Sequence, residues 1–256
     1  DAGHEGLVSP NERVALVTAS PAPTVLFLRG ATLARSTDAG FAAAPGPPVV
    51  PRVSIATRNR QLNVDLFAPE HGYLFHTGRP QRWSGVDWRR VGDTYRAASD
   101  TTYPLRYSVS CEVADQSIGA ADLAPTDAPS LLQLPPSLQA DPRLQTLVSE
   151  LAANAPTAPQ RAAATLNWLA INTRYDGAHR VEGGTLAEAV TAFLFESRKG
   201  ICVEFATAAT VLLRLLGVPT RVVTGYRSHE RDEGRFVIRA RHAHAWIEVA
   251  YDGAGW

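Results

Sequence analysis

One cysteine and two histidines are the residues whose types and spacing could do nucleophilic chemistry. Cys202 follows Gly200 in the segment GICVEFA, and His242 and His244 lie in the segment RHAHAWIEV. A thiolate becomes an effective nucleophile when an imidazole within hydrogen-bonding reach serves as its base or its ion-pair partner. The sequence therefore raises the hypothesis of a cysteine–histidine pair. The second cysteine, Cys111, lies in a predicted strand and is expected to be a packing residue.

The residues after Cys202 predict a buried helix. Apolar and small side chains run almost without interruption from 203 to 216, and Gly217 and Pro219 then supply the signals that end a helix. Cys202 thus falls at the first turn, where unpaired N–H groups and the positive end of the helix dipole favour a thiolate and can bind an oxyanion. Glu204 could touch such a site, and a solvated or structural role for it is at least as well supported. Position alone leaves the role of a core residue open as well, because free cysteines are often buried.

The two histidines lie in a predicted strand that leads into the turn YDGAG. Alternate residues of a strand share a face, which would put His242, His244, Trp246 and Glu248 on one side. Either histidine could then serve Cys202. Two solvated histidines on a surface strand, or an H-x-H metal pair, are the alternatives, although the sequence offers no convincing further metal ligands nearby.

The elements that must position these residues lie in two halves of the chain that differ in sequence pattern. Residues 12–113 contain short, often alternating β-prone segments, which predict a β-rich sandwich or barrel-like domain. From about residue 140, helical patterns precede the Cys202 helix and strands follow it, which is an α+β order. We therefore predict a β-rich N-terminal domain at 1–125, a Pro-rich linker at 126–140 and a catalytic core at 141–256.

The amino-acid composition argues against some classes of function. The 256 residues carry a formal net charge of zero, so no basic field suggests nucleic acid as a partner. No apolar run in the sequence is long enough to span a membrane. Methionine is absent, and we expect the sequence to be a piece of a longer chain.

Taken together, the motifs resemble the transglutaminase-like superfamily, whose papain-like fold carries a cysteine at a helix N-terminus and a histidine on the adjoining sheet. The matching segments are GIC, FA, LR, GVPTR, GY and HAWIE, between residues 200 and 248. AFLFESRKGICVEFA and VLFLRGATL are similar to the membrane-anchored bacterial branch of this superfamily. The likeness is close over the second half of the chain and patchy over the first.

The resemblance implies roles for individual residues. Cys202 would be the nucleophile and His244 the base, because the family histidine directly precedes Ala-Trp. His242 stands where close relatives carry an aspartate, and its role stays open. The third member of the family triad is an aspartate a few residues beyond the Gly-Trp pair, so we expect the core to be truncated after Trp256 and do not assign Asp252 to the triad.

The activity that the resemblance implies is cysteine-dependent acyl transfer on protein or peptide carboxamides through a thioester, of the protein-glutamine gamma-glutamyltransferase type. A primary amine or water would be the acceptor, so a thiol protease or amidase is one alternative, and a non-catalytic peptide- or cell-wall-binding domain is another. No cofactor or metal is implied. The expected location is the periplasmic or extracytoplasmic face of a bacterial membrane, with transmembrane segments outside this sequence.

Overall fold

The computed structural model describes residues 9–44, 49, 51, 53, 56–67, 72–114, 123–179 and 184–256. It forms two compact units, and neither is contiguous in sequence. Unit 1 comprises residues 1–30, 57–113 and 225–244, and unit 2 comprises 31–56, 114–224 and 245–256. The predicted domain ranges 1–125, 126–140 and 141–256 stay a prediction.

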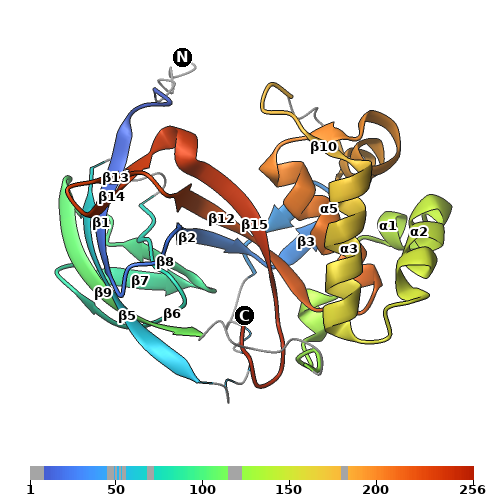
Figure 1. Ribbon diagram of the computed structural model, residues 1–256, viewed down its shortest axis with the longest axis horizontal. Helices are drawn as coiled ribbons and strands as arrows, with labels where there is room; N and C mark the ends of the chain where they lie inside the picture. Colours follow the sequence, from blue (N-terminus) through green and yellow to red (C-terminus); the bar gives the residue numbers. More distant parts are fainter. Residues whose placement is uncertain are drawn as a thin grey trace. The chain divides into compact units, whose positions relative to one another are not determined.

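Unit 1 is built on a six-stranded sheet with the order β13–β14–β1–β5–β9–β6 (Figure 1). β1 pairs antiparallel with β14 on one side and with β5 on the other. Residues from the N-terminal half and residues beyond 230 therefore share one sheet. The strands of this sheet are β1 (Arg13–Ser20), β5 (Thr57–Leu66), β6 (Arg79–Ser84), β9 (Leu105–Ala114), β13 (Arg231–Asp232) and β14 (Arg235–Arg239).

Alternation of side chains explains how this sheet buries one face. Along β5, Leu62, Val64 and Leu66 are buried, whereas the residues between them are more exposed. The buried set packs with apolar residues of β1 and β9 into a single core. Cys111 of β9 is fully buried in this core, and burial raises the pKa of its thiol to about 11. The predicted packing role of Cys111 is confirmed.

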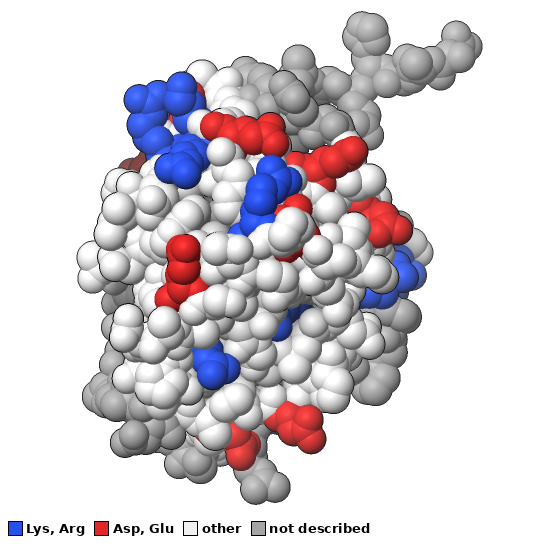
Figure 2. Space-filling model, turned by 90° about the vertical axis from the view of Figure 1, so that its right-hand side faces the viewer, with Lys and Arg blue, Asp and Glu red and all other residues white. Residues whose placement is uncertain are grey.

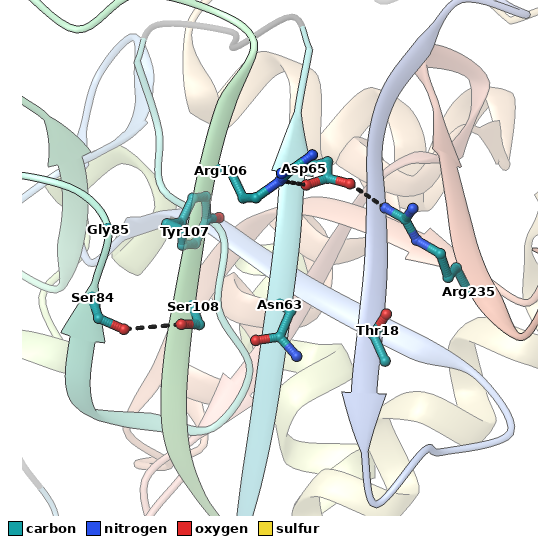
Figure 3. A pocket seen from close by; sticks show the side chains of 9 residues that line it. All are labelled: Thr18, Asn63, Asp65, Ser84, Gly85, Arg106, Tyr107, Ser108 and Arg235. Atoms are coloured by element: carbon teal, nitrogen blue, oxygen red, sulfur yellow. Dashed lines mark hydrogen bonds and ion pairs between the residues drawn. The ribbon is translucent and has the colours of Figure 1, made fainter.

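The opposite face of the sheet is polar (Figure 3). Ser84 and Ser108 share a hydrogen bond of 2.9 Å, and Asp65 lies between Arg106 and Arg235, with which it forms ion pairs. Partial burial raises the pKa of the Asp65 carboxyl, but hydrogen bonds from the two guanidinium groups give a net lowering. One carboxylate between two cations leaves this polar face with a local positive charge.

Unit 2 holds the helices (Figure 1). α3 and α5 pack against each other, and α2 contacts both of them. The prediction that helices precede the Cys202 helix from about residue 140 is confirmed. The helices are α1 (Pro136–Ala140), α2 (Pro142–Ala152), α3 (Ala158–Asn172), α4 (Leu186–Thr191), which continues as a π-helical turn (Ala192–Ser197), and α5 (Cys202–Leu215).

Side-chain caps fix where these helices begin. The carboxylate of Asp141 accepts the N–H groups of Arg143 and Leu144 at the start of α2. Thr157 with Gln160, and Thr185 with Glu188, form capping boxes at the starts of α3 and α4. These bonds satisfy backbone donors that the helix itself leaves unpaired.

The Pro-rich segment is less irregular than predicted. α1 occupies its last part, and a 3₁₀ turn (Pro129–Leu131) precedes it. Pro136 suits the first position of a helix, and Leu138 is fully buried in the helical core. Burial of Leu138 stabilises α1, a helix too short to be predicted from its sequence pattern alone.

The remaining strands form smaller sheets. A three-stranded sheet has the order β15–β12–β2, and each of its strands contributes residues to both units. Two short hairpins, β3–β4 and β7–β8, lie in unit 2 and unit 1, respectively. Their bounds are β2 (Leu26–Leu33), β3 (Arg35–Thr37), β4 (Gly40–Ala42), β7 (Trp88–Val91), β8 (Thr94–Ala97), β12 (Thr220–Ser228) and β15 (Ala243–Val249).

Acidic and basic side chains are interspersed on the surface that Figure 2 displays. Wide uncharged areas separate them among the described residues of that face. None of the helices that the structure describes is both long and apolar enough to cross a membrane.

A buried guanidinium holds the end of α5. Arg214 donates hydrogen bonds to the carbonyl oxygens of Thr220 (2.9 Å), Gln133 (2.8 Å) and Ala34 (2.6 Å), and it lies 5.0 Å from the ring centroid of Phe41. Burial lowers the pKa of Arg214 to about 10, so the group stays charged at neutral pH. This one side chain joins α5 to the start of β12 and to two other segments of unit 2.

We predict that Arg214→Ala lowers the free energy of unfolding by about 3 kcal/mol, because it removes a buried side chain and leaves the buried carbonyl oxygen of Thr220 without the donor that Arg214 provides. Urea denaturation followed by circular dichroism measures the change. Arg89→Ala, at an exposed position of β7, is the control and should cost no more than about 0.5 kcal/mol. Equal losses in the two variants would contradict this role for Arg214.

Candidate active site

Cys202 is the first residue of α5, as the sequence predicts. Most of this helix is buried, whereas its first turn keeps contact with solvent: Cys202 is partly exposed and Val203 is 43% exposed. Gly217, with φ of 75°, ends the helix, and the N–H of Val218 donates to the carbonyl of Leu213. The helix therefore presents a thiol to solvent from an otherwise buried element.

The chain reaches Cys202 through a constrained backbone. Arg198 follows the π-helical turn with φ of 51°, a left-handed conformation that is uncommon for a residue with a side chain. β11 (Lys199–Gly200) then pairs in parallel with β10 (Arg174–Tyr175). A Cβ atom at Gly200 would lie 2.9 Å from the Glu204 side chain, so glycine is required there by close packing.

Glu204 caps the helix that carries Cys202. Its Oε2 accepts the N–H of Ile201 at 2.9 Å, and its Oε1 lies 3.0 Å from Nε2 of His179. A carboxylate in the first turn also interacts favourably with the helix dipole. The sequence left open whether Glu204 touches the site or has a structural role, and in the structure its carboxylate holds the first turn of α5.

Tyr175 lies near the first turn of α5. Burial first, and then the proximity of Cys202, raise the pKa of its phenol. The side chain is 60% exposed. N–H groups in the first turn of a helix have no partner within the helix, and such groups can bind an oxyanion.

His244 lies in β15 and is the last residue of unit 1. Its ring centroid is 6.4 Å from that of Phe27, over whose ring the guanidinium of Arg227 lies at 5.7 Å. Burial first, and then the positive charge of Arg227, lower the pKa of His244. At neutral pH the imidazole is therefore in its neutral form, which can accept a proton.

The prediction that His242 shares a strand face with His244 is wrong. His242 ends a 3₁₀ turn (Ala240–His242), and β15 begins only at Ala243. The His242 Nδ1 accepts the N–H of Arg239, and Nε2 lies 3.4 Å from the Glu230 carboxylate. These bonds close the turn, so the alternation of side chains along β15 does not include His242. Among the described residues no group of three or more side chains has the arrangement of a metal site.

Glu248 of β15 is occupied in a different interaction. It forms a buried ion pair with Arg221 of β12 at 2.7 Å, and the Arg221 guanidinium stacks 3.4 Å from the ring centroid of Trp256. Both charges are almost fully buried, which makes the pair sensitive to loss of either partner. The pair ties β12 to β15 within unit 2.

The structure thus gathers four polar side chains of unit 2 at one helix end. The sequence singles out Cys202 and Glu204, and it marks Tyr175 as an aromatic residue that could line a cleft or belong to the core. His179 completes the group and has no sequence signal, because its contact is with a residue distant in the sequence. His244 belongs to unit 1, and its pairing with Cys202 is a proposal.

Comparison with known proteins identifies the second half of the chain. Residues 145–256 match the model of the Transglutaminase-like superfamily. These residues form a transglutaminase-like domain. The predicted family resemblance is confirmed by this match.

Solved structures confirm the fold. The chain is similar to the crystal structure of the periplasmic domain of TgpA from Pseudomonas aeruginosa, with a TM-score of 0.73, 24% identity and coverage of 97% of this chain and 86% of that one. A second structure of that domain, bound to ethylmercury, matches with a TM-score of 0.71 and 25% identity. The mixed α and β architecture with a transglutaminase-like fold agrees with the prediction.

Curated relatives match a short part of the chain. An uncharacterised protein, YebA of Bacillus subtilis, is 40% identical over 73 residues, and a protein-glutamine gamma-glutamyltransferase of Pseudomonas aeruginosa is 39% identical over 74 residues. The matches cover 26% and 28% of this chain and only 10% and 11% of those relatives.

We predict that the two thiols of the chain differ in accessibility. Both cysteines are free; Cys202, in the transglutaminase-like domain, is partly exposed, whereas Cys111 is fully buried. Titration with a chromogenic disulfide reagent should modify one thiol in the native protein and two in denaturant. Cys202→Ser should abolish the native reaction. Modification of Cys111 at a similar rate in the native protein would contradict the structure.

We also predict that the pKa of His244 lies below the ordinary histidine value of about 6.5 and that Arg227→Gln raises it. The substitution removes a positive charge that disfavours the imidazolium, so the titration midpoint moves to higher pH. NMR titration of the imidazole C–H resonance measures both values. Arg89→Gln is the control and should leave the midpoint unchanged. An unchanged midpoint in Arg227→Gln would exclude this electrostatic effect.

Proposed function

We propose that the chain catalyses cysteine-dependent acyl transfer on protein or peptide carboxamides, with Cys202 as nucleophile and His244 as general base. The observation that carries this proposal is the first turn of α5, where the partly exposed thiol of Cys202 lies at the N-terminus of an otherwise buried helix. The name of the Pseudomonas aeruginosa relative, protein-glutamine gamma-glutamyltransferase, agrees with this chemistry.

In the first half-reaction, the neutral imidazole of His244 takes the thiol proton while Sγ of Cys202 attacks the carboxamide carbon. A C–S bond forms, and the carbonyl oxygen becomes an oxyanion that accepts a hydrogen bond from the backbone N–H of Cys202. The imidazolium returns its proton to the amide nitrogen, the C–N bond breaks and ammonia leaves. The product is a thioester on Cys202.

In the second half-reaction, a primary amine attacks the thioester and gives a proton to His244. A new C–N bond forms, the C–S bond breaks and the proton returns to the sulfur. Water in place of the amine would yield a carboxylic acid, so hydrolysis is the competing outcome of the same intermediate. The ratio of transfer to hydrolysis depends on how well water is excluded from the part of the site where the amine binds.

We further propose an extracytoplasmic location and a membrane-anchored parent protein. The support is the likeness to the periplasmic domain of TgpA, which covers 97% of this chain. In such a location the substrates would be proteins or peptides that present glutamine side chains outside the cytoplasm.

We predict that Cys202→Ala lowers incorporation of a fluorescent primary amine into a glutamine-containing protein by about a thousandfold or more. His244→Ala should lower it by about a hundredfold or more, the range of general acid–base catalysis. Cys111→Ala is the matched control and should retain activity, because Cys111 is buried in the other unit.

Ammonia release measured in parallel separates the outcomes. Release without amine incorporation would indicate an amidase or protease. Neither signal from the wild-type chain would favour a non-catalytic binding domain. Full activity in Cys202→Ala would exclude the proposed nucleophile.

A further inference from the structure

A pocket of unit 2 lies against the first turn of α5. Its volume is about 370 Å³, within the range of sites that bind small ligands or side chains. It is lined by α5, by α4 and the residues before it, and by strands β2, β4, β12 and β15. Its apolar lining residues include Leu33, Phe41, Val190, Val203, Val222 and Ala245.

The pocket adjoins the Cys202 side chain. Two of its lining residues, Val222 and Ala245, belong to a buried apolar cluster, and Cys202 packs against this cluster together with the lining residues Leu33 and Phe41. Val203 and Glu204, the next two residues of the chain, line it as well. A molecule whose carbonyl carbon is held at Sγ can therefore extend a neighbouring group directly into this pocket.

The chemistry of the lining favours an uncharged, apolar group. Glu204 is the one charged residue among the described side chains that line it, and its carboxylate is already held by the N–H of Ile201 and by His179. The remaining polar groups are threonine hydroxyls, of which Thr185 is bound to Glu188 in a capping box. A charged ligand group would lose its hydration there without gaining a partner.

Two features indicate that the pocket is built to be filled. Val203 is 43% exposed immediately after the thiol, where a solvent-exposed β-branched side chain contributes little to the helix. Phe41, which also lines the pocket, has its ring 5.0 Å from the buried guanidinium of Arg214. An apolar group in the pocket would cover Val203 and find an apolar ring already in place.

We propose that this pocket is a specificity subsite that receives an aliphatic or aromatic side chain of the acyl-donor peptide, next to the residue whose carbonyl Cys202 attacks. The proposal rests on the proposed function and adds the class of substrate. Acyl donors with leucine or phenylalanine beside glutamine are preferred over those with aspartate or lysine.

The test uses short peptides that differ only in the residue before or after glutamine, and it measures kcat/KM for ammonia release. Leucine and phenylalanine peptides should exceed aspartate and lysine peptides by about tenfold to a hundredfold on one of the two sides. Val203→Asp, at an exposed position, should reduce the preference for leucine and raise the relative rate of the lysine peptide. Equal rates for all neighbours, with release still dependent on Cys202, would overturn the subsite and leave the proposed function intact.

Leu166→Asp is the matched control, because Leu166 is 49% exposed on α3 and does not line the pocket. It should leave the order of peptides unchanged. A second variant, Thr207→Phe, places a larger side chain of α5 in the pocket and so reduces its volume. It should lower the rates of the leucine and phenylalanine peptides and leave the rate of a glycine peptide unchanged.

A binding measurement tests the subsite without turnover. In Cys202→Ala, titration with the leucine–glutamine peptide should shift the methyl resonances of Val203 and Val222, and the aspartate–glutamine peptide should not. Absence of these shifts would overturn the subsite whether or not the wild-type chain releases ammonia.

Discussion

The buried guanidinium of Arg214 is the interaction on which the geometry of unit 2 depends. Its bonds to the carbonyl oxygens of Thr220, Gln133 and Ala34 fix the C-terminal end of α5 among three other segments. A helix of 14 residues is a stiff element of about 20 Å. Holding one end therefore constrains the other, where Glu204 caps the first turn and Cys202 begins it.

The polar groups of the first turn have separate roles. The carboxylate of Glu204 accepts the N–H of Ile201 and pairs with His179, so it does not bind the N–H of Cys202. The exposed side chain of Tyr175 lies near this turn. In the proposed reaction, Cys202 would supply both the nucleophile and an oxyanion donor. The burial of the rest of α5 holds its first turn in place.

The sequence predicted features that depend on local pattern. Gly217 and Pro219 predicted the end of α5. Features that depend on contacts between distant segments were not predictable. The alignment of β14 beside β1, and the contact of His179 with Glu204, join residues that no single-sequence pattern brings together. His242 was misplaced because it closes a 3₁₀ turn by a bond to the Arg239 N–H, so the strand begins only at Ala243.

The most direct test of the account is detection of the covalent intermediate. The protein is mixed with a glutamine peptide, quenched in acid within milliseconds to seconds, digested and analysed by mass spectrometry. The account predicts an adduct equal to the peptide less ammonia on the Cys202 fragment, labile to hydroxylamine and absent from Cys202→Ala. Ammonia release without such an adduct, or an adduct on Cys111, would contradict Cys202 as the nucleophile.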